Sequence, residues 1–348
     1  MPKKRIIFIY NPVSGGKGKK LILHQIDSLL DRRKYDDEIL RTEYAGHATL
    51  LTRRAVDSGA DIVCAVGGDG TVNEVARGLL HTGVALAIIP CGSGNGLARH
   101  LHIPIAPRRA IDIINKGEIH DMDYGIINDK PFFCTCGVGF DAFISGKFAR
   151  SSHRGPLTYM ENVLKSWLAY NPQTYTLEIL DDDEKQEEKK AFIISCANAS
   201  QYGNNAYIAP MASVRDGVLD VTILKPFSVL DVTQLAIQMF NGTLDQNSNI
   251  ETFRCKRLVI HRDGPGLIHY DGDPVEADAD VQVSIMQSGL KCLSPKEEGR
   301  YAWGENIQDF IVSQWSLFNM HGRAFFEAVR KNNKMLLTKT RLTGNKKK

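Results

Sequence analysis

The sequence predicts an α/β domain built on a doubly wound parallel sheet, followed by a mostly antiparallel β domain. In the first third, short apolar segments alternate with helical ones, as in parallel strands joined by crossover helices. The pattern changes near Asp121, where strand-like segments follow one another with few helices between them. The 348 residues also exceed what a single core usually supports, so two domains are expected.

The first domain, residues 1–125, shows repeated strand and helix units. Strands are expected at 6–10, 62–66 and 85–90, and helices at about 20–32 and 71–80. Glycine-rich loops follow the strands: Asn11-Pro-Val-Ser-Gly-Gly-Lys-Gly, Gly67-Gly-Asp-Gly and Gly92-Ser-Gly-Asn-Gly96. Because ligands of parallel sheets bind beyond the carboxyl ends of the strands, we expect the three loops to share one binding edge.

The second domain, residues 126–294, is expected to be rich in β structure. Its strand-like segments are 132–138, 174–180, 191–197, 219–224, 257–261 and 281–286, and its helical segments are 157–170 and 229–241. Residues 181–190 form a run of acidic and basic side chains. That run predicts a solvated hairpin loop rather than a metal site.

The C-terminal segment, 295–348, is predicted to be a helical extension that packs back on the first domain and ends in a basic tail. Its apolar residues recur at spacings of three and four, as on one helical face: Ile307, Phe310, Ile311, Trp315 and Phe318. The final residues hold many lysines and arginines and few acids. Anionic headgroups attract such tails, so a peripheral contact with an anionic membrane is expected.

Composition excludes several classes of protein. No apolar run approaches the roughly 18 residues of a membrane-spanning helix, and the basic start leads into a short strand rather than a signal peptide. The seven cysteines form no CxxC pair, which indicates reduced thiols in a cytoplasmic protein and argues against zinc. A net charge of +3 gives no ground for nucleic acid as a partner.

The loop from Gly67 to Thr71 is the strongest candidate for a phosphate site. Glycines let backbone N–H groups approach an anion, and the following helix contributes the positive end of its dipole. A capping box is the plainer interpretation, since Thr71 and Glu74 have its spacing. Capping does not explain Asp69, because a carboxylate beside a phosphate needs a metal ion or a proton.

The other two loops are weaker evidence when taken singly. A lone Gly-x-Gly-x-Gly, as at 92–96, is common, and the first loop lacks the GxxxxGK[ST] pattern of a Walker loop. Lys17 and Lys19 could still meet a polyphosphate. Three such loops at one sheet edge favour a nucleotide site.

In order and spacing, these motifs resemble the diacylglycerol kinase catalytic domain family, which includes bacterial lipid kinases, sphingosine kinases and ceramide kinases. The matches in the first domain are Asn11-Pro, Ser14-Gly15, Gly67-Gly-Asp-Gly-Thr-Val-Asn-Glu74, Pro90-x-Gly-Ser-Gly-Asn95 and Leu97-Ala-Arg99. Those in the second are Asp123, Gly137-Val-Gly-Phe-Asp141, Gly203, Pro210, Asp216-Gly-Val-Leu-Asp220 and Asp271-Gly-Asp273. The resemblance extends over about residues 5–290.

The resemblance implies a phosphofructokinase- or NAD-kinase-like nucleotide domain and a β-sandwich domain that takes the lipid. It implies ATP, Mg²⁺ and transfer of the γ-phosphate to a lipid hydroxyl. The residues it implies for the nucleotide are Asn11, Ser14, Gly67, Gly68, Asp69, Gly70, Thr71, Glu74, Gly92, Ser93, Asn95 and Asp273. It also implies Asp69 and Asp216 as metal ligands, the latter for a structural Mg²⁺, and Asp141 as a substrate contact.

Phosphoryl transfer to an alcohol needs charge neutralisation, an in-line hydroxyl and a base that accepts the proton. Asp271 and Asp69 are both candidates for the base, and the sequence does not rank them. Asp123 is a weaker candidate for a catalytic carboxylate.

Two positions depart from the family pattern. Gly96 stands where many bacterial members carry a metal-linked Asp, and sphingosine kinases also lack a carboxylate there. This favours a sphingoid or other single-chain lipid over diacylglycerol. Asp273 stands where the family usually has Glu, which shortens the reach of the carboxylate by one methylene.

Two other functions are compatible with parts of the sequence. A kinase acting on NAD shares Gly-Gly-Asp-Gly-Thr but lacks the Gly-Ser-Gly-Asn loop after Pro90. A non-catalytic nucleotide sensor would account for Gly96, whereas Asp69, Asp271 and Asp273 argue against it. A homodimer is a further expectation.

Overall fold

The computed structural model describes residues 2–13, 19–149, 166, 170–181 and 185–296. The chain divides into two compact units, and the first, Met1–Ser145 with Pro172–Glu297, holds nearly all of the described residues. The predicted C-terminal helix and basic tail, Ser14, and most of the predicted helix at 157–170 lie outside the described residues.

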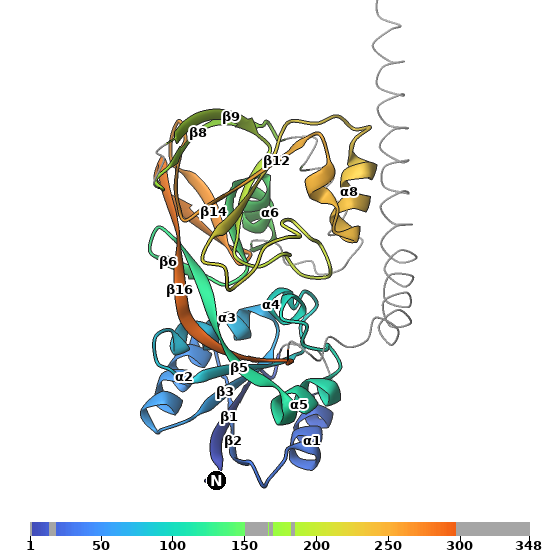
Figure 1. The fold of residues 1–348 in the computed structure, drawn as a ribbon, viewed down its shortest axis with the longest axis vertical. Coiled ribbons are helices and arrows are strands. Elements are labelled where there is room, and N and C mark those ends of the chain that lie inside the picture. The colour runs from blue at the N-terminus through green and yellow to red at the C-terminus, as the bar shows by residue number, and fades with distance from the viewer. Residues whose placement is uncertain (1, 14–18, 150–165, 167–169, 182–184, 297–348) are drawn as a thin grey trace, which may run out of the picture. The chain divides into compact units, whose positions relative to one another are not determined.

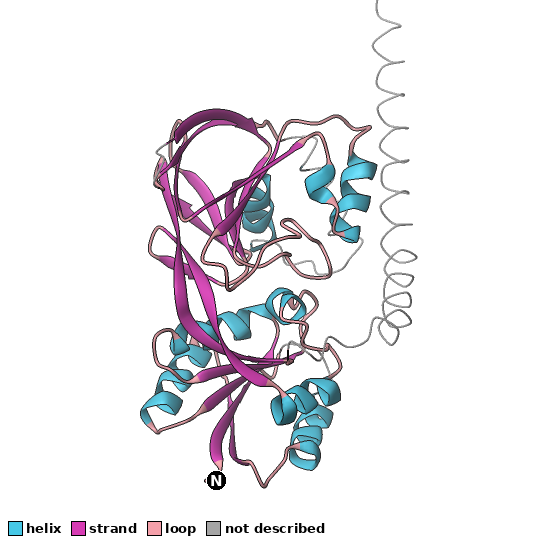
Figure 2. Ribbon diagram, in the orientation of Figure 1, coloured by secondary structure: helices cyan, strands magenta, loops and turns pink. Residues whose placement is uncertain are grey.

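The N-terminal part is a parallel sheet with helices, which confirms the predicted α/β class (Figure 2). Its strands are β1 (Lys4–Tyr10), β2 (Tyr35–Arg41), β3 (Ile62–Gly67) and β4 (Ala85–Pro90). Its helices are α1 (Lys19–Leu29), α2 (His47–Asp57), α3 (Asp69–Leu79), α4 (Gly96–His100) and α5 (Pro107–Lys116). The strand order is β2-β1-β3-β4, and these strands are all parallel.

The inner strands form because their sequences are apolar without interruption. Every residue of β3 and β4 is buried, as expected for strands covered on both faces. β2 is missing from the sequence prediction because it is largely polar and lies at the edge of the sheet.

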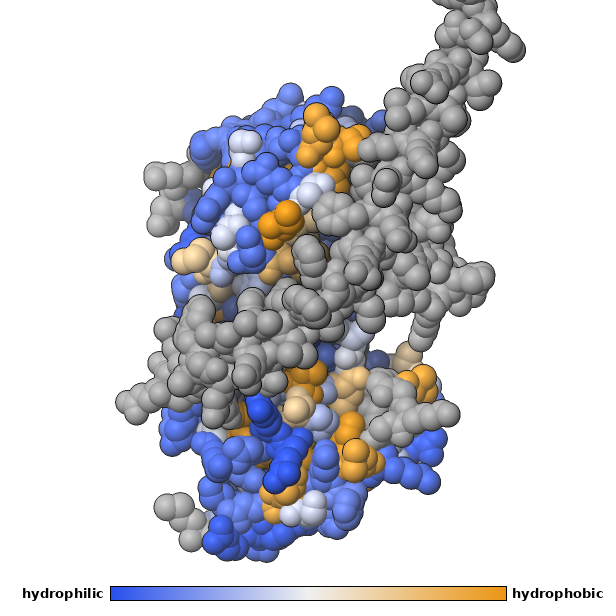
Figure 3. Space-filling view, turned by 90° about the vertical axis from the view of Figure 1, so that its right-hand side faces the viewer, coloured by the Kyte–Doolittle hydropathy of each residue, from blue (hydrophilic) through white to orange (hydrophobic). Residues whose placement is uncertain are grey.

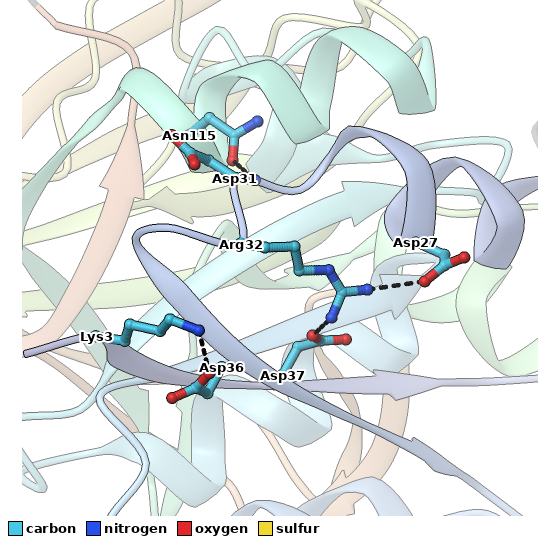
Figure 4. A network of polar contacts seen from close by, with 7 residues as sticks. All are labelled: Lys3, Asp27, Asp31, Arg32, Asp36, Asp37 and Asn115. Atoms are coloured by element: carbon cyan, nitrogen blue, oxygen red, sulfur yellow. Dashed lines mark hydrogen bonds and ion pairs between the residues drawn. The ribbon is translucent and has the colours of Figure 1, made fainter.

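Polar contacts secure the segment between α1 and β2 (Figure 4). Arg32 forms ion pairs with Asp27 of α1 and Asp37 of β2. The backbone N–H of Asp31 donates to Asn115 Oδ1 of α5 at 2.9 Å. The edge strand is thereby tied to two helices of the same domain.

Two long strands carry the first sheet into the second half of the molecule (Figure 1). β5 (Glu118–Ile127) and β16 (Asp280–Ser294) pair in antiparallel fashion. β16 continues the first sheet beside β4, where Lys291 pairs with Ala85 in parallel. The expected domain boundary at residue 125 therefore lies within β5, and the end of β16 belongs to the sheet of the first domain.

The second half is a β-sandwich, as predicted. Its further strands are β6 (Lys130–Phe132), β7 (Thr135–Gly139), β8 (Gln173–Ile179), β9 (Lys185–Ala191), β10 (Ile193–Ala197), β11 (Leu219–Leu224), β12 (Ile250–Cys255), β13 (Arg257–His261), β14 (Gly266–Tyr270) and β15 (Asp273–Ala277). Its helices are α6 (Phe140–Ala149), α8 (Val232–Asn241) and the short 3₁₀ helix η2 (Leu244–Gln246). One sheet has the order β12-β11-β10-β7-β14-β15, and apolar residues of this sheet and of β8, β13 and β16 share one core.

Two strand predictions need correction. Residues 185–191, expected within a solvated loop, form β9, which pairs along its length with β8. Charged side chains are tolerated there because β9 is an edge strand, and Lys189 forms an ion pair with Glu251. The single strand expected at 132–138 is two strands, β6 and β7, which belong to different sheets.

The face of the molecule in Figure 3 is mostly hydrophilic, with separate hydrophobic groups. Among the large apolar side chains on the surface, Leu230 is 90% exposed, just before α8, and Ile237 and Phe240 of α8 are also exposed. In the part of the chain that the structure describes, no helix has the length and apolar character needed to cross a membrane.

Helix α3 begins earlier than predicted, at Asp69, so Thr71 lies inside its first turn and caps nothing. The Glu74 carboxylate accepts hydrogen bonds from the backbone N–H groups of Gly46 (2.8 Å) and Ala48 (2.9 Å), at the start of α2. The capping-box prediction is wrong. Both Glu74 oxygens serve the neighbouring helix, which also argues against the predicted contact with a nucleotide.

We expect Glu74→Ala to lower the free energy of unfolding by about 1 kcal/mol, because the start of α2 loses a charged acceptor. The dissociation constant for ATP should not change. Denaturant unfolding and a nucleotide titration measure the two effects, with Glu74→Gln as the variant that keeps one acceptor oxygen. A tenfold loss of ATP affinity at unchanged stability would contradict the structural role.

Candidate functional site

Two glycine-rich loops meet at the carboxyl ends of β3 and β4. A Cβ atom at Gly92 would lie 2.7 Å from the Cα atom of Gly68, and one at Gly67 would lie 2.5 Å from the Thr71 side chain. Both distances are shorter than real Cβ contacts, so glycine is required by close approach. The strand ends therefore present backbone, not side chains, to any ligand at this edge.

The Asp69 carboxylate holds these two loops together. Its Oδ2 accepts the backbone N–H of Asn95 at 2.9 Å, and its Oδ1 accepts that of Gly96 at 2.7 Å. Hydrogen bonds to an ionised acceptor are roughly twice as strong as neutral ones. These two N–H groups explain a carboxylate among glycines without a metal ion or a proton.

Asn95 closes the second loop on itself. Its side chain accepts the N–H of Gly92 at 2.9 Å and donates to the carbonyl of the same residue at 2.8 Å. Its backbone is left-handed, with φ 52°, a conformation that Asn tolerates better than most residues. Ser93 is exposed at the tip of this loop, whereas Asn95 is buried.

The loop after β1 begins beside the other two. Asn11 Nδ2 donates to Thr71 Oγ1 at 3.4 Å, and Asn11 Oδ1 accepts the N–H of Val13. Gly70 is exposed at the start of α3. The predicted nucleotide residues of the three loops thus lie at one sheet edge, except Ser14, which the structure does not describe.

Asp271 and Gly272 form the two-residue turn between β14 and β15. Both have positive φ, 51° and 88°, and the flanking residues Tyr270 and Asp273 pair across the hairpin. Asp-Gly is a favoured sequence for such turns. The motif that the resemblance assigns to catalysis therefore contains a hairpin turn.

The Asp271 side chain turns back toward the backbone. Its carboxylate accepts hydrogen bonds from the N–H groups of Phe133 (2.8 Å), Cys134 (2.7 Å) and Thr135 (3.1 Å). Burial raises the pKa of Asp271 to about 6, against the effect of these donors. The carboxylate fastens the hairpin to the start of β7, which argues against Asp271 as the catalytic base.

Asp273 is the carboxylate that this hairpin leaves available. Its side chain is 61% exposed, and its Oδ2 lies 3.8 Å from Nη2 of Arg77 on α3. Within the described part of the chain, its carboxylate accepts no hydrogen bond of ordinary length. Arg77 also lies over the ring of Tyr270, 5.0 Å from its centroid.

Asp123 has a structural position in β5. Its carboxylate is buried and accepts the N–H groups of Gly217 (2.9 Å) and Ser288 (2.8 Å). It joins β5 to the turn before β11 and to the irregular middle of β16. The enclosure of both oxygens argues against the predicted catalytic role.

Asp216 faces the guanidinium of Arg254. Its Oδ2 is 3.9 Å from Nη1 of Arg254, and its Oδ1 accepts the N–H of Val218 at 3.4 Å. Among the described residues, no group of three or more His, Cys, Asp or Glu is arranged to hold a metal ion. The predicted structural Mg²⁺ at Asp216 stays a prediction.

Asp141 starts α6 and lies in a buried polar network. Its Oδ2 contacts His269 Nε2 at 2.9 Å and accepts the hydroxyl of Tyr202 at 3.2 Å. Burial and the charge of Asp141 raise the pKa of Tyr202. The predicted substrate contact of Asp141 stays a prediction, and the structure adds His269 and Tyr202 to its surroundings.

The second glycine loop also contacts the segment that follows β10. The N–H of Asn204 donates to the Gly94 carbonyl at 3.0 Å, and Arg99 joins Gly94 to Asn205 through its guanidinium. A Cβ atom at Gly203 would lie 2.9 Å from Gly94. The loop is therefore held from both halves of the molecule.

Gly96, which departs from the family pattern, is tightly enclosed. A Cβ atom there would lie 3.2 Å from the carbonyl oxygen of Tyr202 and 3.4 Å from Cys134 Sγ. An Asp would require these neighbours to move. The structure thus gives a packing reason for glycine at this position.

Sequence reasoning missed Arg77, which stands in the last turn of α3 and belongs to no recognised motif. It also missed the hydrogen bonds of Asp271 to the backbone of Phe133, Cys134 and Thr135. The Asp-Gly dipeptide between two strand-like segments was a signal for a hairpin turn that could have been used.

We expect Asp271→Ala to lower the free energy of unfolding by about 2–4 kcal/mol, because three N–H groups lose their acceptor and a left-handed residue gains strain. Asp271→Asn keeps one oxygen and tolerates the turn, so it should cost less. Chemical denaturation ranks the two variants. A fully stable but inactive Asp271→Ala protein would restore the catalytic assignment.

Comparison with known proteins agrees with this architecture. The diacylglycerol kinase catalytic domain matches residues 5–127, and the YegS C-terminal NAD kinase beta sandwich-like domain matches residues 134–293. The chain is 28% identical to a diacylglycerol kinase of Mycobacterium tuberculosis over 84% of this chain and 96% of the relative. It is 28% identical to a diacylglycerol kinase of Bacillus subtilis over 78% and 90% of the two chains. A solved diacylglycerol kinase of Bacillus anthracis shares the fold, with a TM-score of 0.63 at 20% identity over 84% of this chain and 98% of that one. Residues 5–127 therefore belong to the diacylglycerol kinase catalytic domain family, and the two family models together match most of the chain.

Proposed function

We propose that this protein is an ATP-dependent lipid kinase that transfers the γ-phosphate to a lipid hydroxyl. The observation that carries the proposal is the pair of glycine loops joined by the Asp69 carboxylate at the carboxyl ends of β3 and β4. Backbone N–H groups at such a position suit a polyphosphate. Family membership supports a lipid as the acceptor.

The residues of the site fit a Mg²⁺ ion that arrives with the nucleotide. Asp69 is the one carboxylate among the loops, and both of its oxygens already accept an N–H group. Mg²⁺ commonly keeps waters and substrate phosphates as ligands and takes only one or two carboxylates. When bound, it would neutralise charge on the β- and γ-phosphates. Asp69 itself fixes the loops that receive those phosphates.

Asp273 is the residue we assign as the base. The acceptor hydroxyl gives its proton to the Asp273 carboxylate while the hydroxyl oxygen forms a bond to the γ-phosphorus. The bond between that phosphorus and the β–γ bridging oxygen breaks, and ADP leaves. The exposure of Asp273 and its lack of a hydrogen bond within the described residues support this role over Asp271.

For the substrate, we propose a sphingoid or monoacyl lipid in preference to diacylglycerol. A side chain at Gly96, such as the third carboxylate that many bacterial members have, would require the carbonyl of Tyr202 to move. The lipid is expected to be taken at a membrane surface, by a protein located in the cytoplasm and peripherally attached. Membrane contact and a homodimer stay predictions.

We expect Asp273→Asn to lower kcat by about 10²–10⁴-fold, the usual contribution of a positioned base. The dissociation constant of ATP should stay within twofold, since the ion-pair partner of Asp273 is Arg77 and not a described residue of the glycine loops. Steady-state kinetics with a nucleotide titration separate the two effects. Equal losses of binding and rate would place Asp273 in the nucleotide site instead.

Radiolabelled ATP supplied with sphingoid bases, monoacylglycerol, diacylglycerol and NAD tests the proposed function directly. Label in a lipid, with the highest kcat/KM for a single-chain lipid, is the expected result. A higher kcat/KM for diacylglycerol would overturn the substrate class. Label in NAD alone, or in no acceptor, would overturn the lipid kinase itself.

A further inference from the structure

The guanidinium of Arg77 is unusual in its hydrogen bonding. Its Nε and Nη2 atoms are buried, and among the described residues neither has a hydrogen-bond partner. Buried donors of this kind are rare, because an unsatisfied charged group loses its hydration without compensation.

Two neighbours of this guanidinium, Tyr270 and Asp273, belong to one hairpin. The Arg77 side chain starts from α3, the helix whose first turn contains the Asp69 carboxylate. It ends over the Tyr270 ring, at 5.0 Å, and opposite Asp273 Oδ2, at 3.8 Å. Arg77 is therefore a direct connection between the nucleotide helix and the Asp-Gly hairpin.

The distance from Arg77 to Asp273 is that of an ion pair without a hydrogen bond. The Asp273 side chain is 61% exposed, and its partner is 26% exposed. The planar fork of arginine also fixes the direction of a carboxylate better than the ammonium group of lysine does.

We propose that Arg77 is the positioning residue for the base: it holds the Asp273 carboxylate in the orientation that receives the proton of the acceptor hydroxyl. This inference rests on the proposed function, and it assigns to Arg77 a role that the glycine-loop motifs do not contain. Arg77 is not a catalytic residue, because it acts on the substrate only through Asp273.

The charged groups around Asp273 indicate in which direction Arg77 shifts the pKa of the Asp273 carboxylate. Burial raises the pKa of Asp273, Arg77 lowers it, and Glu74, on the same helix as Arg77, raises it. Lys130 of β6 lies near enough to Tyr270 and Arg77 to interact with both, and it is paired with Asp129. Arg77 is thus the cation that favours the ionised, proton-accepting form of Asp273.

The first experiment compares pH profiles of kcat/KM for the lipid in the wild type and Arg77→Met. Loss of a cation within about 4 Å should raise the pKa of Asp273, so the acid limb should move up by about one pH unit. At neutral pH, kcat should fall about tenfold while KM for ATP stays within twofold. Arg77→Lys keeps the charge, so it should restore the acid limb but recover only part of kcat.

Arg53→Met is the matched control, since Arg53 is an exposed arginine of the neighbouring helix α2. It should reproduce the wild-type profile. A simple structural role for Arg77 would lower the stability without moving the acid limb, and that result would overturn the proposal. Adding Arg77→Met to Asp273→Asn should lower kcat no further, because Arg77 acts through Asp273. A loss of kcat as large as in the wild-type background would also overturn the proposal.

A second measurement does not depend on activity. The Asp273 carboxylate is titrated by ¹³C NMR in the wild type and in Arg77→Met, with its signal assigned by its absence in Asp273→Asn. A pKa higher by about one unit in Arg77→Met is expected. An unchanged titration overturns the proposal even in an active kinase. A shifted titration in a protein that phosphorylates no lipid supports the contact and places the failure in the proposed function.

Discussion

The hydrogen bonds of the Asp69 carboxylate are the constraint on which the rest of the site depends. They join the start of α3 to the start of α4, and so fix two loops that leave neighbouring strands. Gly68 and Gly92 approach each other so closely that a Cβ atom at Gly92 would lie 2.7 Å from the Cα atom of Gly68. The second loop is held in turn by contacts from Asn204 and Arg99, so its geometry also depends on the second half of the molecule.

The second half supplies the acceptor side of the proposed reaction through one hairpin. Asp271 fastens the turn to the start of β7, and this leaves Asp273 as the exposed carboxylate. In the proposed reaction, the two acids of the Asp271-Gly-Asp273 motif have separate tasks, one structural and one chemical. Arg77 connects the second of them to the nucleotide helix, so the proton acceptor and the phosphate cradle share α3 as a common support.

Much of this arrangement could be predicted from the sequence, where the signals are local. β3 and β4 follow from uninterrupted apolar runs, and the shared edge of the glycine loops follows from the parallel sheet. The partners of the acids could not be predicted, because they are distant in sequence. Glu74 caps α2, and Asp271 binds the backbone before β7, contacts that only tertiary packing creates. The edge strand β9 was missed because pairing with β8 outweighed its charged composition.

The role of Asp69 is tested most directly by nucleotide binding to Asp69→Asn, measured by calorimetry with Mg²⁺–ATP and again with ATP in the presence of a chelator. An amide at this position can accept only one of the two N–H groups, so the loops should lose their alignment. The account predicts a loss of affinity of at least about tenfold, or about 1.4 kcal/mol, that is the same in both conditions. A loss confined to the samples with Mg²⁺ would show that Asp69 acts chiefly as a metal ligand, and unchanged affinity in both would show that the carboxylate does not organise the site.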